Sequence, residues 1–491
     1  MAQKYERIVV VGGGSAGWMT ATALATEFKG RIGIELVESE DIGIIGVGEA
    51  TFPSIREYNR LVGIDEAEFL RATNGTYKLG IRFHDWLELG RDYFHTFGHF
   101  GNLFGSQTLW AQHRRMGLAE PLGQQCVPTV MAMQGRFVLP SEQAQFKYAY
   151  HFDAVQYAAF LRQLAIQRGV RHTQGRIVEV ARRADGGVAA LQLDDGRRVE
   201  GDLFIDCSGF RSLLLGDALQ EPFVDFSHWL PVDGAWACPC ERSGEEIKPY
   251  TEATALEGGW AWRIPLQNRT GHGHVFSSRF IDVDRAREQL LARLDGKPLA
   301  EPRLLRFTTG HRQRFWVHNV VSIGLSSGFL EPLESTSIYL IQDGIARLMA
   351  ALTTGRPLDE NDLALFNDGA ARRFARIRDF IILHYCLTRR RDSELWRHVA
   401  TMELPETLAF RLALWRGYGV LHEYDEEGFD ATSWLAIHAG MDHWPERQDP
   451  VIAEIPAERA LQALKGRSKA IAASVERMPL HRSTLRQVLG Q

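Results

Sequence analysis

The sequence predicts an α/β protein that begins with a Rossmann-like nucleotide-binding segment and ends in a largely helical part. A β-branched strand runs directly into a glycine-rich turn and a helix over 8–28. A later apolar strand ends in Asp206, and apolar residues recur at helical spacing after residue 355. These features together favour an α/β fold with a mixed sheet and a helical C-terminal part.

The first element is the stretch RIVVVGGGSAGWMTATALATEF, in which Gly12, Gly14 and Gly17 fit the pattern GxGxxG. Helix-forming residues fill 16–28. Glycines let a pyrophosphate approach the backbone closely, and the start of the helix offers free N–H groups and a favourable dipole. A glycine turn alone is weak evidence, but the order of strand, turn and helix predicts a dinucleotide site.

The next strand, RIGIELVES, ends in Glu38, where such folds place an acid about 20 residues after the motif to bind a ribose. The segment GDLFIDCSGFRSLLL at 201–215 predicts a strand, a Ser208-Gly209 turn and a helix. With 151–172 it resembles the middle of FAD-dependent monooxygenase-type folds. The sequence holds no second GxGxxG, which argues against a separate NAD(P)H site.

The rest of the chain changes character near residue 355. A hairpin with an Asp-Gly turn is predicted at 187–201, and further strands at 258–267, 273–280 and 319–328. Helical periodicity dominates 362–385 and 406–421. We therefore expect a mixed α/β cofactor region over 1–355 and a mainly helical cap over 356–491.

Composition limits the possible partners. The 491 residues are 45% hydrophobic and 24% charged, with a formal net charge of -5, so we expect no general attraction to nucleic acid or anionic membranes. The basic run at 389–391 is followed by Asp392 and Glu394, which predicts a solvated, locally paired surface.

Five scattered cysteines, an odd number, fit a reducing cytoplasm better than a disulfide framework. They are Cys126, Cys207, Cys238, Cys240 and Cys386. Cys238-Pro239-Cys240 lacks metal-ligand spacing and predicts a strand, so no metal site is expected. The sequence shows no signal peptide and no apolar run near the roughly 18 residues of a membrane span, which predicts a cytoplasmic protein.

Five motifs follow one another along the chain: GGGSAGWM, IGVGEAT at 45–51, TYKLGIRFHDW at 76–86, WAWRIP at 260–265 and GFLEPLESTSI at 328–338. In order and spacing they resemble flavin-dependent halogenases of the tryptophan halogenase family, over nearly the whole chain. WxWxIP is the signature that separates this family from related flavin monooxygenases.

The resemblance implies that reduced FAD, O2 and bromide or chloride yield hypohalous acid, which travels through the protein to a lysine beside the substrate. A separate NAD(P)H-dependent reductase would supply the reduced FAD. Trp260 and Trp262 point to one face of a strand and, with Ile264 and Pro265, would form a wall that keeps substrate away from the flavin. The alternative is an ordinary aromatic strand in a core.

Lys78 matches the family's catalytic lysine. Its ammonium can hydrogen-bond hypohalous acid, or its amine can form a haloamine. Most lysines in proteins are solvated, but Tyr77 before Lys78 and LGIRF after it predict partial burial here.

Glu334 matches the family's essential glutamate and could orient the oxidant or remove the ring proton. It could also be an acid near a helix start, with Pro332 in the first turn. The same helix start offers Thr336 and Ser337 as a halide seat. Most family members have glycine where Ser337 stands.

For FAD, the resemblance implies a strap at 41–51, in which Gly46 and Gly48 give freedom of movement, although an ordinary glycine loop remains possible. The residues implied to line the FAD are Gly12, Gly13, Gly14, Ser15, Ala16, Gly17, Glu38, Glu49, Ala50, Thr51, Leu325 and Ile338.

His95, Phe97 and Trp434 could line the substrate pocket, and core packing is the competing interpretation. The clamp for free tryptophan contains adjacent tyrosines, whereas Tyr418 and Tyr424 are separated here. This favours indole or another electron-rich aromatic. Two other functions share part of the evidence: an FAD-dependent aromatic hydroxylase, and a non-catalytic flavin-binding protein.

Overall fold

The computed structural model describes residues 5–39, 48–101, 103, 109–141, 145–354, 356–447 and 449–491. The chain forms two compact units, each made of three segments. The first unit contains Met1–Gly75, Phe152–Asp233 and Arg306–Ala375, and the second contains Thr76–His151, Gly234–Leu305 and Arg376–Gln491. The boundary at residue 355 stays a prediction. The last described strand is β22, and every described element after it is helical.

The first unit is built on a six-stranded sheet in the order β20-β21-β12-β1-β2-β8. Its strands are β1 (Arg7–Val11), β2 (Gly33–Glu38), β8 (Arg171–Gln174), β12 (Leu203–Asp206), β20 (Trp316–Val317) and β21 (Val320–Ser322). All neighbouring pairs are parallel except β20 with β21. The predicted α/β fold is therefore confirmed, and all but one of the strand pairs in this sheet are parallel.

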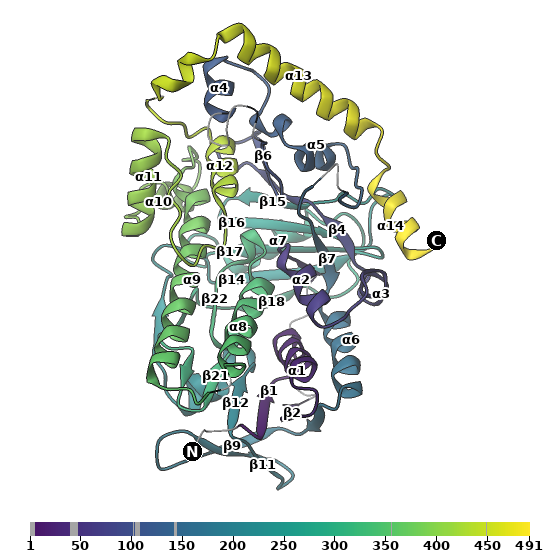
Figure 1. Ribbon diagram of the computed structural model, residues 1–491, viewed down its shortest axis with the longest axis vertical. Helices are drawn as coiled ribbons and strands as arrows, with labels where there is room; N and C mark the ends of the chain where they lie inside the picture. The colour runs from purple at the N-terminus through teal and green to yellow at the C-terminus, as the bar shows by residue number, and fades with distance from the viewer. Residues whose placement is uncertain are drawn as a thin grey trace. The chain divides into compact units, whose positions relative to one another are not determined.

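Helices and small sheets complete this unit. Helix α1 (Ser15–Phe28) contacts β1, β2 and α6 (Figure 1). The other helices are α2 (Ser54–Leu61), α3 (Glu66–Ala72), α6 (Ala154–Gln167) and α8 (Ser337–Leu352). The other strands are β3 (Gly48–Ala50), β9 (Ile177–Arg182), β10 (Val188–Leu193), β11 (Arg198–Glu200), β13 (Phe223–Asp225), β19 (Gly310–Arg312) and β22 (Gly328–Phe329). The antiparallel pair β10 and β11 is the predicted Asp-Gly hairpin.

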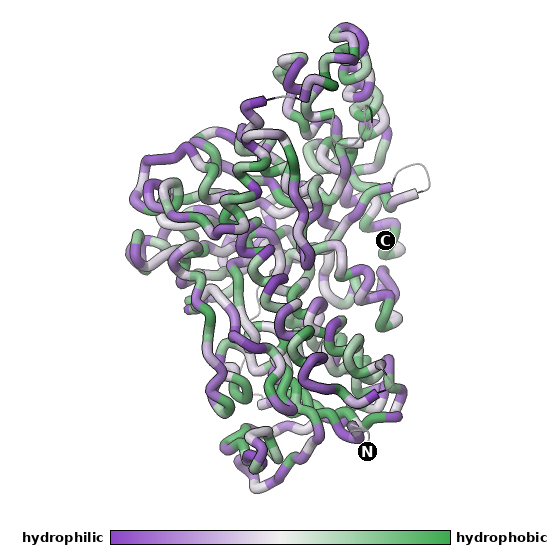
Figure 2. Tube along the Cα trace, turned by 60° about the vertical axis from the view of Figure 1, so that its left-hand side comes forward, coloured by the Kyte–Doolittle hydropathy of each residue, from purple (hydrophilic) through white to green (hydrophobic). Residues whose placement is uncertain are grey.

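Strand β1 lies in the middle of the sheet, and its residues 8–10 are completely buried. Figure 2 shows hydrophobic strands close to the N-terminus. A run of β-branched residues without polar alternation suits such a strand, because helices cover both faces of a parallel sheet. Each fully buried side chain of this kind stabilises the fold by about 2 kcal/mol.

The second unit contains a seven-stranded sheet in the order β18-β14-β17-β16-β15-β5-β6. Its strands are β5 (Gly80–His84), β6 (Asp92–Thr96), β14 (Gly234–Cys240), β15 (Thr251–Leu256), β16 (Gly259–Pro265), β17 (Thr270–Phe276) and β18 (Arg303–Arg306). The predicted strand at Cys238–Cys240 is thus part of β14. A separate short strand, β4 (Thr76–Lys78), pairs antiparallel with β7 (Ala149–Asp153).

Helices make up most of the C-terminal segment, as expected. They are α9 (Glu360–Cys386), α10 (Glu394–Val399), α11 (Glu406–Tyr418), α12 (Ala431–Gly440), α13 (Ala457–Glu476) and α14 (His481–Leu489). Figure 1 shows α13 followed directly by α14 at the C-terminus. Earlier helices of the unit are α4 (Leu109–Arg115), α5 (Val127–Met133) and α7 (Val283–Leu291).

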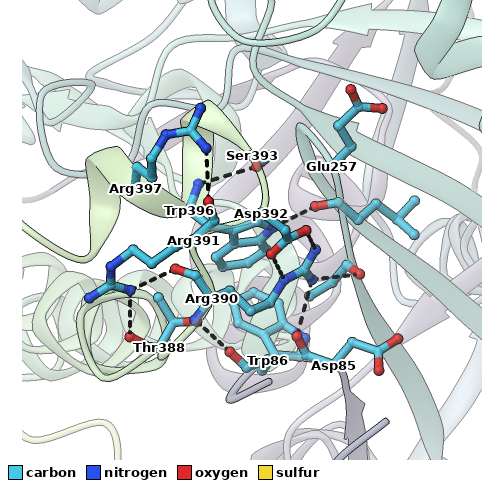
Figure 3. A network of polar contacts seen from close by, with 12 residues as sticks. Asp85, Trp86, Glu257, Thr388, Arg390, Arg391, Asp392, Ser393, Trp396 and Arg397 are labelled. Atoms are coloured by element: carbon cyan, nitrogen blue, oxygen red, sulfur yellow. Dashed lines mark hydrogen bonds and ion pairs between the residues drawn. The ribbon is translucent and has the colours of Figure 1, made fainter. Parts of the chain in front are cut away.

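The run of three arginines is partly buried, so the prediction of a solvated surface is wrong for Arg390, which is 5% exposed. Its Nε and Nη2 donate to Asp392 at 2.9 and 2.7 Å, as local pairing predicts (Figure 3). Its Nη1 donates to the carbonyls of Asp85 and Ala255, each at 3.1 Å. The guanidinium also lies 4.6 Å from the centre of the Trp396 ring. Burial is tolerated because the donors are satisfied and the flat cation stacks on indole.

Among the described residues, no helix is both long enough and apolar enough to cross a membrane. That part of the chain also contains no group of three or more His, Cys, Asp or Glu residues placed to hold a metal ion.

Candidate functional site

The glycine turn after β1 has the geometry that dinucleotide binding requires. Gly12 has φ +110°, and a Cβ there would lie 2.4 Å from the carbonyl oxygen of Cys207. A Cβ on Gly17 would lie 1.8 Å from the carbonyl oxygen of Gly12. Only glycine fits either position without rearrangement. The turn and the first turn of α1 are therefore packed as closely as the motif predicts.

The start of α1 is open where a phosphate group would lie. Gly14 is the N-cap residue and no side chain caps the helix. A Cβ on Gly14 would meet no atom within 4 Å. The N–H groups of the first turn, which begins with Ser15 and Ala16, are thus available for a pyrophosphate, and the residues present fit a dinucleotide such as FAD.

Glu38 lies beside this turn, at the end of β2. A Cβ on Gly13 would lie 1.3 Å from its Oε2, so the carboxylate occupies the space that the glycine leaves. Its Oε1 contacts His172 Nε2 at 2.7 Å, and His172 packs edge-on against Trp18 at 5.3 Å. One carboxylate oxygen is therefore held by the protein, and the role of this acid in binding a ribose stays a prediction.

Asp206 ends β12 and organises the following turn. Its carboxylate accepts from the N–H groups of Leu214 and Leu215 at 2.8 and 2.9 Å, and from the Ser208 hydroxyl at 2.6 Å. Burial raises its pKa. The helix predicted after the turn is present as a 3-10 helix (Gly209–Arg211) and a π-helix (Leu213–Ala218). The Asp206 carboxylate accepts hydrogen bonds from N–H groups at the start of the π-helix.

The remaining predicted FAD residues fall in two places. Gly324 precedes Leu325, and a Cβ on it would lie 2.7 Å from the Cβ of Ala16, so this segment packs on the start of α1. Ile338 is buried in α8. Glu49 and Ala50 lie in β3 and are followed by the fully buried Thr51. Burial raises the pKa of Glu49 to about 7. The predicted strap residue Gly46 lies outside the described residues.

Glu334 and the predicted halide residues lie on two consecutive helical elements. Glu334, 2% exposed, ends a 3-10 turn (Pro332–Glu334). Ser335 has φ +60°, and α8 begins only at Ser337. The sequence predicts Pro332 in the first turn of the helix that follows. In the structure Pro332 starts its own 3-10 turn instead, because the left-handed Ser335 separates that turn from α8. Thr336 is the N-cap of α8 and is fully buried.

The hydroxyl of Thr336 makes no hydrogen bond to any described residue, and it makes no side-chain cap on α8. A buried hydroxyl without a partner is costly. A small anion accepting from this hydroxyl and from the first N–H groups of α8 would remove that cost. The residues present therefore fit a halide.

Lys78 is completely buried, whereas the sequence predicts only partial burial. It ends β4, and its Nζ lies 5.3 Å from the centre of the Phe97 ring. A buried ammonium over an aromatic face is stabilised by a cation–π interaction. The structure thus brings together two of the predicted residues, Lys78 and Phe97.

A chain of hydrogen bonds connects β4 to the end of the WAWRIP strand. The Thr76 hydroxyl donates to the carbonyl of Pro265 at 2.8 Å and contacts His151 Nδ1 at 3.0 Å. His151 Nε2 contacts the Thr251 hydroxyl at 3.0 Å. Because Pro265 can only accept, the direction is set: His151 donates from Nδ1 to Thr76 and accepts at Nε2 from Thr251. Burial and the charge of Lys78 lower the pKa of His151, consistent with this neutral ring.

The tryptophan pair lies in the interior of the large sheet. Trp260 and Trp262 are 1% and 7% exposed, and their ring centres are 6.2 Å apart. Trp262 covers Gly273 of β17, where a Cβ would lie 2.0 Å from the indole ring. Ile264 and Pro265, which follow them on β16, are also buried. A rigid aromatic surface is present, and its role as a wall stays a prediction.

The predicted substrate residues His95 and Trp434 meet in one aromatic cluster. His95, on β6, lies 5.5 Å from Phe380, and Trp434, on α12, lies 5.1 Å from it. Phe380 stacks on Phe429 at 3.9 Å. Arg411 lies 4.3 Å from the Trp434 ring. These contacts also describe a packed core, so a pocket at this place stays a prediction.

Comparisons with known proteins were decisive for the family. The family model described as tryptophan halogenase matches residues 7–457. The chain belongs to the tryptophan halogenase family.

Solved structures agree with this assignment. The flavin-dependent halogenase BrvH from Brevundimonas sp. BAL3 is 43% identical, with 99% of each chain covered and a TM-score of 0.95. The flavin-dependent halogenase Xcc4156 from Xanthomonas campestris is 44% identical, with the same coverage and TM-score. The tryptophan 6-halogenase SttH of Streptomyces toxytricini is 34% identical over 94% of this chain and 95% of its own. The predicted fold and the predicted enzyme class are thus confirmed.

The sequence motifs of a tryptophan halogenase do not include every residue that holds β4. His151 and His481 both bond to this strand, yet neither lies in a recognisable motif. A histidine in an apolar stretch, such as His151 in YAYHFD, is a weak signal because buried histidines are common in cores.

Proposed function

We propose that the protein is a two-component flavin-dependent halogenase that transfers an electrophilic halogen to an electron-rich aromatic compound such as indole. The observation that carries the proposal is the complete burial of Lys78 on β4, over the ring of Phe97, in a chain of the tryptophan halogenase family. A solvated lysine would not support this role.

FAD would be held by the glycine turn at 12–17, by Glu38 and by residues around Leu325 and Thr51. When bound in its reduced form, FAD supplies, with O2 and bromide or chloride, the hypohalous acid. A separate NAD(P)H-dependent reductase would supply reduced FAD, since this chain has no second GxGxxG. The Thr336 hydroxyl and the start of α8 would hold the halide before its oxidation.

The ammonium of Lys78 would donate a hydrogen bond to the oxygen of hypohalous acid and so direct the halogen toward the ring. The carbon–halogen bond forms as the halogen–oxygen bond breaks, and the oxygen leaves as water after it takes up a proton. The ring then loses its own proton to a base. We assign this general-base role to Glu334, whose carboxylate is buried.

The substrate class follows from the segment around α11 and α12. Related proteins are named tryptophan halogenases, such as SttH. Tyr418 and Tyr424 of this chain are not adjacent, and Tyr418 is 70% exposed. The chain thus lacks the pair of adjacent tyrosines that would clamp an amino acid group, which favours indole over free tryptophan.

The test is mass spectrometry of indole and of tryptophan incubated with the protein, FAD, a flavin reductase, NADH, and bromide or chloride in parallel. A halogen isotope pattern is expected, stronger for indole. Lys78→Ala should abolish halogenation, by roughly a factor of 1000 or more, and leave FAD binding unchanged. A hydroxylated product would indicate a monooxygenase instead, and halogenation that survives Lys78→Ala would refute the role of Lys78.

A further inference from the structure

Strand β4 is three residues long and lies at the end of its sheet. It pairs with β7 on one edge only, with Tyr77 opposite Tyr150 and Lys78 opposite Ala149. In an antiparallel pair, the N–H groups of alternate residues point away from the neighbour. The outer edge of β4 therefore needs hydrogen-bond partners from elsewhere in the fold.

Two groups distant in sequence meet that outer edge. The N–H of Tyr77 donates to Nε2 of His481 at 3.1 Å, and the N–H of Leu79 donates to the carbonyl of Pro249 at 2.7 Å. His481 Nδ1 lies 2.8 Å from the carbonyl of Ile247. His481 and the segment 247–249 thus take the place of a neighbouring strand.

The protonation of His481 follows from its partners. The backbone N–H of Tyr77 can only donate and the carbonyl of Ile247 can only accept, so Nε2 carries the lone pair and Nδ1 carries the proton. Burial lowers the pKa of His481 to about 4, so the ring is neutral near pH 7. A protonated ring would have no lone pair for Tyr77.

His481 is held firmly at the start of α14. It is 0% exposed, and its own N–H donates to the carbonyl of Gly135 at 2.9 Å. Its ring lies 5.9 Å from that of Tyr77 and 5.8 Å from that of Phe137. Thr484, one turn later, donates to the carbonyl of Phe137 at 2.5 Å. The imidazole therefore presents a fixed acceptor to β4.

We propose that His481 is a positioning residue for halogenation: by accepting the N–H of Tyr77 it fixes the backbone next to Lys78 and thereby the direction of the Lys78 ammonium. The role rests on the proposed function of Lys78. Loss of one backbone bond matters here because so short a strand has few others. A displaced ammonium would let hypohalous acid escape before it reacts with the aromatic ring.

The test compares His481→Phe, which keeps a ring but loses both hydrogen bonds, with His481→Gln, whose amide can accept and donate. Leu485→Ala is the matched control, because Leu485 is buried in the same helix but its side chain can make no hydrogen bond to β4. Each full-length variant receives FAD, a flavin reductase, NADH, bromide and indole. The readout is bromoindole formed per hypobromous acid caught by an excess of a soluble β-diketone trap.

We expect His481→Phe to lower this ratio by about 10-fold or more at unchanged FAD affinity, and His481→Gln to recover most of it. Leu485→Ala should lower the melting temperature and leave the ratio at the wild-type value. If His481→Phe does not fold, His481→Asn, which can reach the Ile247 carbonyl alone, takes its place with the same expected loss.

A ratio for the His481 variants equal to that of Leu485→Ala would overturn the positioning role and leave the proposed function intact. A wild-type protein that yields neither bromoindole nor hypobromous acid would instead refute the proposed function, and the role of His481 with it.

Discussion

The glycine turn of the first unit and strand β4 of the second hold functional groups in different ways. In the turn, the closest approach to another backbone atom joins Gly17 to Gly12, five positions earlier in the chain. On β4, Thr76 bonds to Pro265 and Tyr77 bonds to His481, which are 189 and 404 positions away. The turn should therefore be sensitive to added side-chain volume, and β4 to the loss of distant hydrogen-bond partners.

The largest effect should come from volume in the turn. Gly17→Val places a Cβ 1.8 Å from the Gly12 carbonyl oxygen, so we expect a loss of roughly 4 kcal/mol or more in the free energy of unfolding and no FAD binding. Urea unfolding and flavin fluorescence titration measure both.

Gly14→Ala is the matched change in the same motif. A Cβ there meets no atom within 4 Å, so stability should stay close to that of the wild type while FAD binding weakens. A stable Gly17→Val protein would contradict the close packing, and unchanged FAD affinity in Gly14→Ala would place the pyrophosphate elsewhere.

Acid should disturb β4 before it disturbs the turn. The pKa of His481 is lowered from 6.5 to about 4 by burial, so the unfolded chain binds a proton that the folded chain does not. Stability should fall by up to about 3 kcal/mol as the pH drops from 6.5 to 4, and level off below that. The lowered pKa of His151 acts in the same direction.

Hydrogen exchange followed by mass spectrometry checks this prediction. Peptides covering 76–79 should lose protection over that pH range before peptides covering 8–17. The pH dependence should shrink in His481→Gln, whose side chain does not titrate. Equal loss of protection in both regions would contradict the comparison.

Glu38 should contribute moderately to the binding of FAD. Glu38→Gln keeps the shape of the side chain. It removes the negative charge that contacts His172 and that would accept a hydrogen bond from the ribose, so we expect FAD to bind about 10-fold more weakly. Isothermal titration with FAD measures the change. His172→Gln, which leaves the carboxylate in place, should have a smaller effect, and the reverse order would contradict the assignment of Glu38 to the ribose.

The smallest effect concerns the hydrogen-bond chain behind β4. Thr251→Val removes the hydroxyl that contacts His151 Nε2 and should cost about 1 kcal/mol in the free energy of unfolding. Thr254→Val, on the same strand, is the control, and a chemical denaturation curve for each compares them. Equal curves would show that His151 does not need this donor.

Much of the first unit was predictable because its signals are local. The buried run of β1, the glycine pattern and the position of Glu38 each follow from neighbouring residues, and the structure has them as predicted. The predictions failed where a local pattern allowed two outcomes. Pro332 suits any helix start, but the left-handed Ser335 separates its 3-10 turn from α8. The arginine run predicts a solvent-exposed surface, yet Arg390 is buried and contacts Asp85, Ala255 and Trp396.

The sequence by itself determined β1, α1, β2, the Asp-Gly hairpin, the long C-terminal helices, the close turn and the family resemblance, because periodicity and the conformational range of glycine act over a few residues. It also placed Trp260 and Trp262 on one face of a strand. Only the tertiary structure decided which groups complete β4, why Lys78 is fully buried, and which nitrogens of His151 and His481 carry protons. Those properties depend on partners from other elements of the fold, up to 404 positions away, and no local pattern encodes the partner of a backbone N–H at the edge of a sheet.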